Sequence, residues 1–218
     1  GEADAFIAGT YSSSHQTGEI AKEVVGIRPS YDHFATMHIM NTKRGTYFLA
    51  DTMINQDNDE ETLFDIARLA RYSVEYFAHE PVMAMVSYSN FGSNCDGESE
   101  CKRVHTVVDR MQQRYPELPI DGEMQVKYAM NKEARDERYP FTRLLGKDVN
   151  TLIFPNLSSA NATYQLIQSM SETEVIGPIQ MGLNKPIHFT DCEASVRDIV
   201  NITAVAVIDA IVEKKKKQ

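Results

Sequence analysis

The sequence predicts an α/β fold in which helices cover both faces of a mostly parallel β-sheet, forming a three-layer sandwich. Short apolar runs rich in β-branched and aromatic residues alternate with longer segments of helical periodicity. This alternation favours βαβ units, whose helices bury a parallel sheet on both sides. The 218 residues are 42% hydrophobic and 24% charged, a globular composition that allows a core of substantial size.

Five short runs have the composition of strands. They cover residues 5–8, 35–40, 46–50, 82–88 and 151–154. Only the polar segment 41–45, which ends in Gly45, separates the second run from the third. A short connection of this kind is typical of a hairpin, so we expect one antiparallel pair within the sheet.

Four segments have the periodicity of helices. The first follows the acidic residues 59–61, which favour a helix start. Its apolar positions recur at i, i+3, i+4 and i+7 and are Leu63, Ile66, Ala67, Ala70, Val74 and Phe77. The others cover residues 102–115, which end before Pro116, and then 159–170 and 196–212.

The charge and hydropathy of the chain exclude several classes of partner. A net charge of −9 argues against nucleic acid, because phosphate binding needs clustered Lys and Arg. The one basic run, 214–217, is typical of a solvated helix end. No apolar run is long enough to span a bilayer, and no signal peptide begins the sequence. We therefore expect a cytoplasmic protein without a membrane partner, and the opening residues 2–9 suggest a fragment that starts mid-fold.

The cysteines favour free thiols over a disulfide framework. Cys95, Cys101 and Cys192 stand beside ten methionines, which fits a reducing cytosol. Cys95 and Cys101 are six residues apart without a matching Cys or His pair, so no zinc site is expected.

No Gly-x-Gly-x-x-Gly motif follows a strand, and the segment has no dinucleotide fingerprint of its own.

Two hydroxyl-rich loops follow predicted strands, where ligands bind in open α/β sheets. The first carries Ser89, Asn90, Gly92 and Ser93, which could present donors to an anion or serve as an ordinary turn. The second, 9–15, carries Ser12 and Ser13 and ends in a histidine that titrates near neutrality, although loop histidines are more often solvent-exposed than catalytic.

The head of the last helix has two interpretations. Ser195 and Asp198 have the spacing of a capping box, in which each side chain bonds the backbone N–H of the other. Alternatively, Asp198 is a base, but a helix N-terminus keeps a carboxylate ionised and therefore weakly basic. The spacing alone favours the cap.

A series of short motifs runs from residue 8 to residue 200. They are Ala8-Gly9 with its Ser/Thr loop, Gly26-Ile27-Arg28-Pro29, Asp51 and Asn55, Met85-Val86-Ser87-Tyr88-Ser89, Gly92-Ser93, Asp121-Gly122-Glu123-Met124-Gln125, Phe154-Pro155-Asn156-Leu157, Asn161, the block 177–186 and Asp198-Ile199-Val200. In this order they resemble the phosphate acetyl/butyryltransferase family. The resemblance implies ligand-binding roles for Ser12, Ser13, Ser89, Asn90, Gly92, Ser93, Asn161, Gly177, Pro178, Gly182 and Ser195.

Within that family the chain is most similar to the C-terminal domain of hybrid NADP-dependent malic enzymes. Residues 158–161 read Ser-Ser-Ala-Asn where acetyltransferases usually show Gly-Asn, and 185–188 and 199–207 also resemble the hybrids. The resemblance implies a parent that decarboxylates malate oxidatively to pyruvate and reduces NADP. NADP and a divalent metal, Mg or Mn, would bind in another half of that parent, and neither a cofactor nor a metal is expected in this segment.

The catalytic pair of the family is altered. Aligned on Lys185-Pro186 and Asp198, the family's Ser-Arg pair falls on Asp191 and Cys192. A thiol cannot replace the donors of a guanidinium, and an added carboxylate repels an anionic substrate. Asp198, Asp191 and Cys192 are therefore treated as vestigial catalytic candidates, with no catalytic residue assigned.

The family fold implies two lobes, of which the first is incomplete here. Residues 1–26 would end the first lobe, 27–176 would form an inserted lobe, and 177–218 would return to the first lobe with a C-terminal helix. The inserted lobe would form a homodimer, with higher oligomers in the parent, and the cleft between the lobes would bind acetyl-CoA or acetyl phosphate.

These inferences lead to one main hypothesis and two alternatives. The main one is an acetyl-CoA-binding regulatory and oligomerisation portion of an NADP-dependent malic enzyme, without transferase activity. The first alternative is an active phosphate acetyl/butyryltransferase in which Arg197 replaces the lost arginine. The second is a dimerisation module that binds no ligand.

Overall fold

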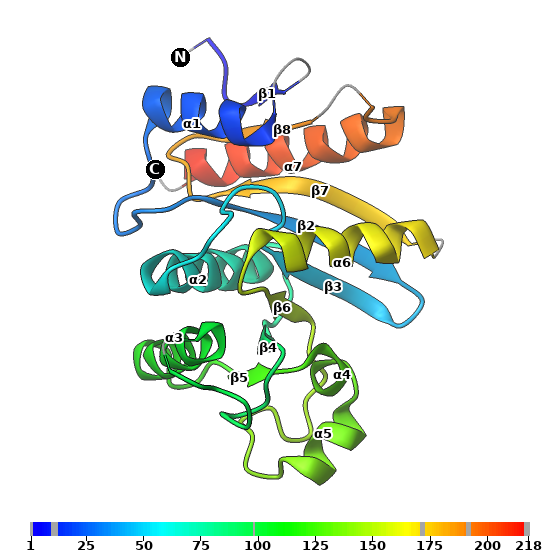
Figure 1. Ribbon diagram of the computed structural model, residues 1–218. Helices are drawn as coiled ribbons and strands as arrows, with labels where there is room; N and C mark the ends of the chain where they lie inside the picture. The colour runs from blue at the N-terminus through cyan, green and yellow to red at the C-terminus, as the bar shows by residue number, and fades with distance from the viewer. Residues whose placement is uncertain (1, 10–12, 98, 171–172, 191–192, 216–218) are drawn as a thin grey trace.

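The computed structural model describes residues 2–9, 13–97, 99–170, 173–190 and 193–215 (Figure 1). Its main sheet contains six strands within these ranges, in the order β5-β4-β6-β3-β2-β7. The strands are β2 (Ala35–Thr42), β3 (Gly45–Ala50), β4 (Met83–Val86), β5 (Ile120–Met124), β6 (Thr151–Ile153) and β7 (Glu174–Met181).

The predicted α/β class with a mostly parallel sheet is confirmed. Strands β3, β6, β4 and β5 run parallel to one another, whereas β2 is antiparallel to both of its neighbours. The expected hairpin is the β2–β3 pair, which closes between Thr42 and Gly45. The parallel strands β3, β6, β4 and β5 therefore have their carboxyl ends at the same edge of the sheet, and the loop that follows β4 lies at this edge.

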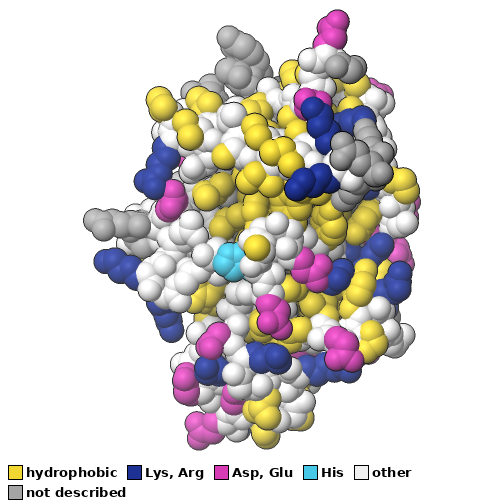
Figure 2. All heavy atoms as spheres, turned by 180° about the vertical axis from the view of Figure 1, so that it is seen from behind, with side chains coloured by type: hydrophobic (Ala, Val, Ile, Leu, Met, Phe, Trp, Pro, Cys, Tyr) yellow, Lys and Arg dark blue, Asp and Glu magenta, His cyan; other side chains and the backbone are white. Residues whose placement is uncertain are grey.

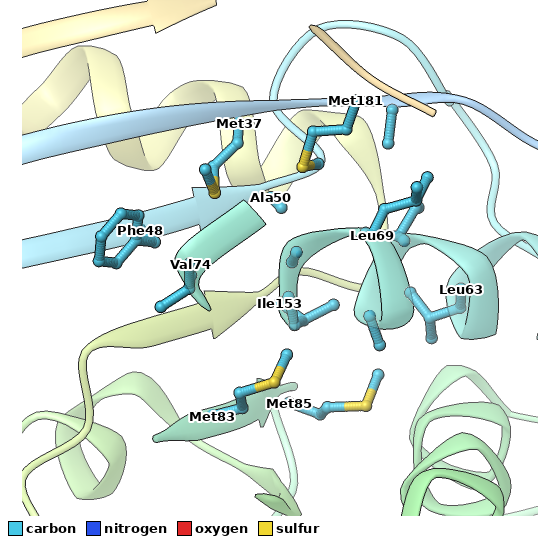
Figure 3. Packing of buried hydrophobic residues seen from close by; sticks show 14 of the residues in the cluster. Met37, Phe48, Ala50, Leu63, Leu69, Val74, Met83, Met85, Ile153 and Met181 are labelled. Atoms are coloured by element: carbon cyan, nitrogen blue, oxygen red, sulfur yellow. The ribbon is translucent and has the colours of Figure 1, made fainter. Parts of the chain in front are cut away.

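Helices cover both faces of this sheet and complete the three layers (Figure 1). Helices α2 (Glu60–Tyr76) and α3 (Glu100–Arg114) cover one face. Helices α4 (Val126–Ala129) and α6 (Leu157–Met170) cover the other, and α5 (Lys132–Arg138) follows α4. Figure 3 shows the core under α2, where Val74 lies near Met37 and Phe48 of the sheet and Leu69 lies near Met181.

A smaller unit joins the two ends of the sequence. Strand β1 (Phe6–Ala8) pairs in parallel with β8 (Ile187–Phe189), flanked by α1 (Ser14–Val25) and α7 (Val196–Lys215). His188 Nδ1 accepts the backbone N–H of Gln180, so its Nε2 carries the proton and faces Asp209 Oδ2 of α7 at 3.0 Å. This bond ties α7 to β8 and β7.

Helix α7 leaves part of its surface uncovered. Its exposed apolar residues are Val196, Ile199, Val200, Val207, Ile208 and Ile211. Figure 2, seen from behind, shows hydrophobic side chains gathered over the upper half of the molecule, where α7 lies in Figure 1. None of the helices in the described part of the chain is long and apolar enough to cross a membrane.

Several elements of the structure were not predicted from the sequence, and each omission has a physical reason. Strand β5 carries Asp121, Gly122 and Glu123 at its centre, and β7 carries Gly177 and Pro178, which are disfavoured in strands. Helix α1 is polar and contains Gly18, so residues 9–15 are not all loop and the histidine at position 15 belongs to the helix. The predicted lobe boundary at 176/177 falls within β7.

One cysteine pair departs from the expectation of free thiols. Cys95 and Cys101 form a disulfide in this structure, so the expectation is wrong for this pair. Helix α3 begins at Glu100 and folds back toward the loop, which leaves the two Cα atoms 5.7 Å apart, within bridging distance. A six-residue spacing alone does not reveal such a turn.

Candidate functional site

The strongest candidate site is a cleft of about 250 Å³ between α6, β7 and the start of α7. We call it the β7 cleft. Its lining includes His38, Tyr164, Gly177, Pro178, Thr190 and Asp198. They come from five separate stretches of sequence, which only the pairing of β7 with β2 and the packing of α6 and α7 bring together.

His38 is the main polar group on the sheet side of the cleft. It lies on β2 and is only 4% exposed. Its ring stacks on Tyr164 of α6, with 4.2 Å between ring centroids. Burial lowers the pKa of His38 to about 3, because the charged imidazolium loses its hydration. The ring is therefore neutral at physiological pH.

A buried hydrogen-bond chain holds His38 from behind. Its Nδ1 lies 2.8 Å from Thr52 Oγ1, which is 3.3 Å from Thr36 Oγ1. The Thr36 hydroxyl donates to Asp51 Oδ1 across 2.6 Å. The other Asp51 oxygen, Oδ2, accepts from the backbone and side chain of Asn55. Asp51 is thus fully bonded and anchors the chain.

Gly177 allows β7 to approach His38. Its φ is +148°, and a Cβ built there would lie 2.6 Å from His38 Cδ2 and 3.0 Å from the Met37 carbonyl oxygen. Any side chain would displace the imidazole, so glycine at this position shapes the cleft wall.

The predicted capping box at the head of α7 is present. Asp198 Oδ2 accepts hydrogen bonds from the backbone N–H and the hydroxyl of Ser195, and the Asp198 N–H donates to Ser195 Oγ. The carboxylate thus lines the cleft while engaged in a cap, as the structural interpretation expects.

The charge of the cleft is acidic or neutral. Asp198 and Glu193 line it, and no Lys or Arg stands among its lining residues in the described part of the chain. Arg197, the proposed substitute for the lost arginine, instead donates to Glu174 with 2.6 Å between Nη2 and Oε1, and its side chain is 71% exposed.

The loop after β4 is a separate site candidate. Its predicted residues bond within the loop or to β5. Asn94 N–H donates to Ser89 Oγ, Asn90 N–H donates to Ser93 Oγ, and Gly92 N–H donates to Glu123 Oε1. Two strands, β6 and β3, separate β4 from β2, the nearest strand that lines the β7 cleft, so roughly 14 Å of sheet lies between this loop and the cleft.

The remaining predicted residues are dispersed. Asn161 lies beside the cleft, where its amide contacts the Thr52 carbonyl at 3.4 Å. Ser13 caps α1 by accepting from the Gln16 N–H, and Gly182 lines a different hollow with Arg28 and Asp209. Ser12, Asp191 and Cys192 lie outside the described residues.

Sequence reasoning did not single out His38 or Tyr164. The one signal available for His38 is a histidine inside an otherwise apolar strand, which indicates a buried polar group that needs partners. The described residues contain no group of three or more His, Cys, Asp or Glu side chains arranged to hold a metal ion.

The architecture just described is that of a phosphotransacetylase fold. A phosphotransacetylase from Staphylococcus aureus superposes with a TM-score of 0.84 at 27% identity, covering 98% of this chain and 64% of that one. One from Streptococcus pyogenes gives a TM-score of 0.86 at 28% identity with the same coverage. Residues 1–207 match the family described as phosphate acetyl/butaryl transferase, and the chain belongs to this family.

Relatives of two kinds resemble the chain. An NADP-dependent malic enzyme from Salmonella typhimurium is 38% identical over 96% of this chain, but this chain spans only 27% of that protein. A phosphate acetyltransferase from Treponema pallidum is 32% identical over 96% of the chain and 65% of its own length. The chain therefore spans about a quarter of this malic enzyme and about two thirds of this phosphate acetyltransferase.

Proposed function

We propose that this chain is the phosphate acetyltransferase-like regulatory portion of an NADP-dependent malic enzyme, and that its β7 cleft binds acetyl-CoA without transferring the acetyl group. The identity of 38% to a malic enzyme, against 32% to a phosphate acetyltransferase, supports the parent. The parent decarboxylates malate oxidatively to pyruvate in the cytoplasm. NADP and a divalent metal, Mg or Mn, bind in its remaining part.

The observation that carries the loss of transfer is the charge of the cleft. Acyl transfer to phosphate needs cations against the phosphate and against the developing negative charge. The described lining contributes Asp198 and Glu193 instead, and Arg197 is paired with Glu174. The sequence also places Asp191 and Cys192 where the family has Ser and Arg. Loss of one such donor typically slows a reaction about 100-fold to 1,000-fold.

The same charge favours acetyl-CoA over acetyl phosphate as the occupant. Phosphate beside Asp198 is repelled at short range, whereas the thioester and pantetheine arm of acetyl-CoA carry no charge. Binding of this effector changes malate oxidation through a coupling free energy between the two sites. Residues 27–176 form the homodimer contact, with higher oligomers in the parent.

The test measures malate oxidation by the full-length protein with and without saturating acetyl-CoA, and acetyl phosphate formation from acetyl-CoA and phosphate in the same preparation. We expect a changed malate rate and no measurable acetyl phosphate. An unchanged malate rate, together with no binding in calorimetry, favours a dimerisation module and overturns the proposal.

The relatives also support a second function, that of an active acyltransferase. The chain covers 65% of a phosphate acetyltransferase and 64% of solved phosphotransacetylases, so an active acyltransferase fits the same likeness. Steady acetyl phosphate formation in the assay above establishes this second function in place of the first.

A further inference from the structure

One ring nitrogen of His38 has no hydrogen-bond partner among the residues that the structure describes. Its Nδ1 is bonded to Thr52, and no hydrogen bond to Nε2 is formed by any residue that the structure describes. The side chain is only 4% exposed, yet its ring forms part of the β7 cleft wall beside Gly177. Nε2 is not among the fully buried polar atoms that lack a partner in the described part of the chain, so this nitrogen is accessible from the cleft. A ligand in the cleft supplies such a partner.

The hydrogen-bond chain behind His38 has a direction. The Thr36 hydroxyl donates to Asp51 Oδ1, so its one proton is used in that bond. Thr36 Oγ1 can then only accept from Thr52, across 3.3 Å. When the Thr52 hydroxyl donates to Thr36, Thr52 Oγ1 accepts from His38 Nδ1 at 2.8 Å. In this arrangement the proton of the neutral ring is on Nδ1, and Nε2 keeps its lone pair.

We propose that Asp51, acting through Thr36 and Thr52, fixes His38 as a hydrogen-bond acceptor in the β7 cleft, where Nε2 selects a ligand that carries an uncharged N–H donor. This inference rests on the proposed function. It names the group of acetyl-CoA that the cleft recognises, which is an amide N–H of the pantetheine arm. His38 is a specificity-determining residue in this role, and Asp51, Thr36 and Thr52 are positioning residues.

The surroundings exclude an anion at the same position. An acceptor atom repels the oxygens of a phosphate, and Asp198, which also lines the cleft, adds negative charge. The ring cannot become cationic to compensate, because burial holds its pKa near 3. A donor that is itself uncharged satisfies Nε2 without these costs.

The experiment compares two matched variants of the full-length protein by calorimetry with acetyl-CoA and with acetyl phosphate. His38→Asn keeps an amide at the position of Nδ1 and removes the acceptor at Nε2. His38→Gln places its amide at the position of Nε2 and restores an acceptor. Both lose the stack on Tyr164, and His38→Gln also loses the bond to Thr52, so tighter binding by His38→Gln than by His38→Asn reports the acceptor at the position of Nε2.

We expect His38→Asn to weaken acetyl-CoA binding about tenfold and His38→Gln to stay within about twofold of the wild type. Thr52→Val frees the ring to move its proton to Nε2, and we expect a loss of about fivefold while the imidazole stays in place. None of the variants strengthens or weakens the response to acetyl phosphate. Thermal unfolding of each variant confirms that it is folded.

Two outcomes separate the failure of this inference from the failure of the proposed function. Wild-type affinity for acetyl-CoA in folded His38→Asn, or equal losses in the Asn and Gln variants, overturns the inference alone. Absence of acetyl-CoA binding by the wild-type protein overturns the proposed function.

Discussion

The guanidinium of Arg197 lies 2.6 Å from the carboxylate of Glu174 and joins the first turn of α7 to the start of β7. The alternative function requires this guanidinium to act on a ligand in the β7 cleft. Its side chain is 71% exposed and outside the lining, so the pairing with Glu174 occupies it at the protein surface.

Replacing Arg197 therefore leaves ligand binding intact. We expect Arg197→Ala to change acetyl-CoA affinity less than twofold and the free energy of unfolding by about 0–1 kcal/mol, as for an exposed ion pair. Calorimetry and urea unfolding measure the two quantities, and Glu174→Ala serves as the matched control. A loss of acetyl phosphate formation in Arg197→Ala alone would instead give this arginine the catalytic role.

Ser195 is expected to matter for stability. Its hydroxyl accepts from the Asp198 N–H and donates to the Asp198 carboxylate, so Ser195→Ala should lower the free energy of unfolding by about 1 kcal/mol. Ser99 has the same position before α3 without a side-chain cap bond, and Ser99→Ala should cost less. Urea unfolding of both variants checks the difference, and equal losses contradict it.

Gly177 and Gly45 form a pair that separates backbone strain from steric contact. Both have a positive φ, +148° and +136°, but a Cβ at Gly45 meets nothing within 4 Å whereas one at Gly177 meets His38 at 2.6 Å. We expect Gly177→Ala to cost about 1–3 kcal/mol more than Gly45→Ala and to weaken acetyl-CoA binding. Similar unfolding midpoints for the two variants would show that the contact relaxes without cost.

The depressed pKa of His38 predicts acid sensitivity. The unfolded ring binds a proton below about pH 6.5, while the folded ring resists protonation until about pH 3. The stabilisation is therefore complete above pH 6.5 and falls as the pH drops, by about 2 kcal/mol at pH 5. Urea unfolding between pH 8 and pH 5 should show a shallower decline in His38→Gln than in the wild type. Parallel curves would contradict the burial of a neutral ring.

Prediction from the sequence succeeded where local patterns decide the structure. The hairpin at 41–45, the helix that begins after Asp59 and the cap at Ser195 follow from turn chemistry, periodicity and capping. Strand β7 did not follow, because Gly177 and Pro178 are unfavourable in strands and its position depends on pairing with β2. Edge strands tolerate such residues, but a sequence does not reveal which strand lies at an edge.

The same limit applies to the candidate site. Gly177 and Asp198 were found through a resemblance of motifs, and the structure places both among the lining residues of one cleft. His38 and Tyr164 are 126 positions apart, as their numbers show, and they meet only because α6 crosses the face of β2. The direction of the bonds from Asp51 to His38 depends on three side chains meeting in space, which no periodicity encodes.

The pairing of β1 with β8 affects the order in which parts of the chain can fold during translation. Phe6 donates its N–H to the Pro186 carbonyl, and Thr190 donates to the Ala8 carbonyl, so about 180 residues of chain are synthesised between the two partner strands. The six-stranded sheet can assemble most of its strands beforehand, but residues 6–8 must wait in the nascent chain until residues 187–189 emerge. During that interval residues 6–8 lack their pairing with β8.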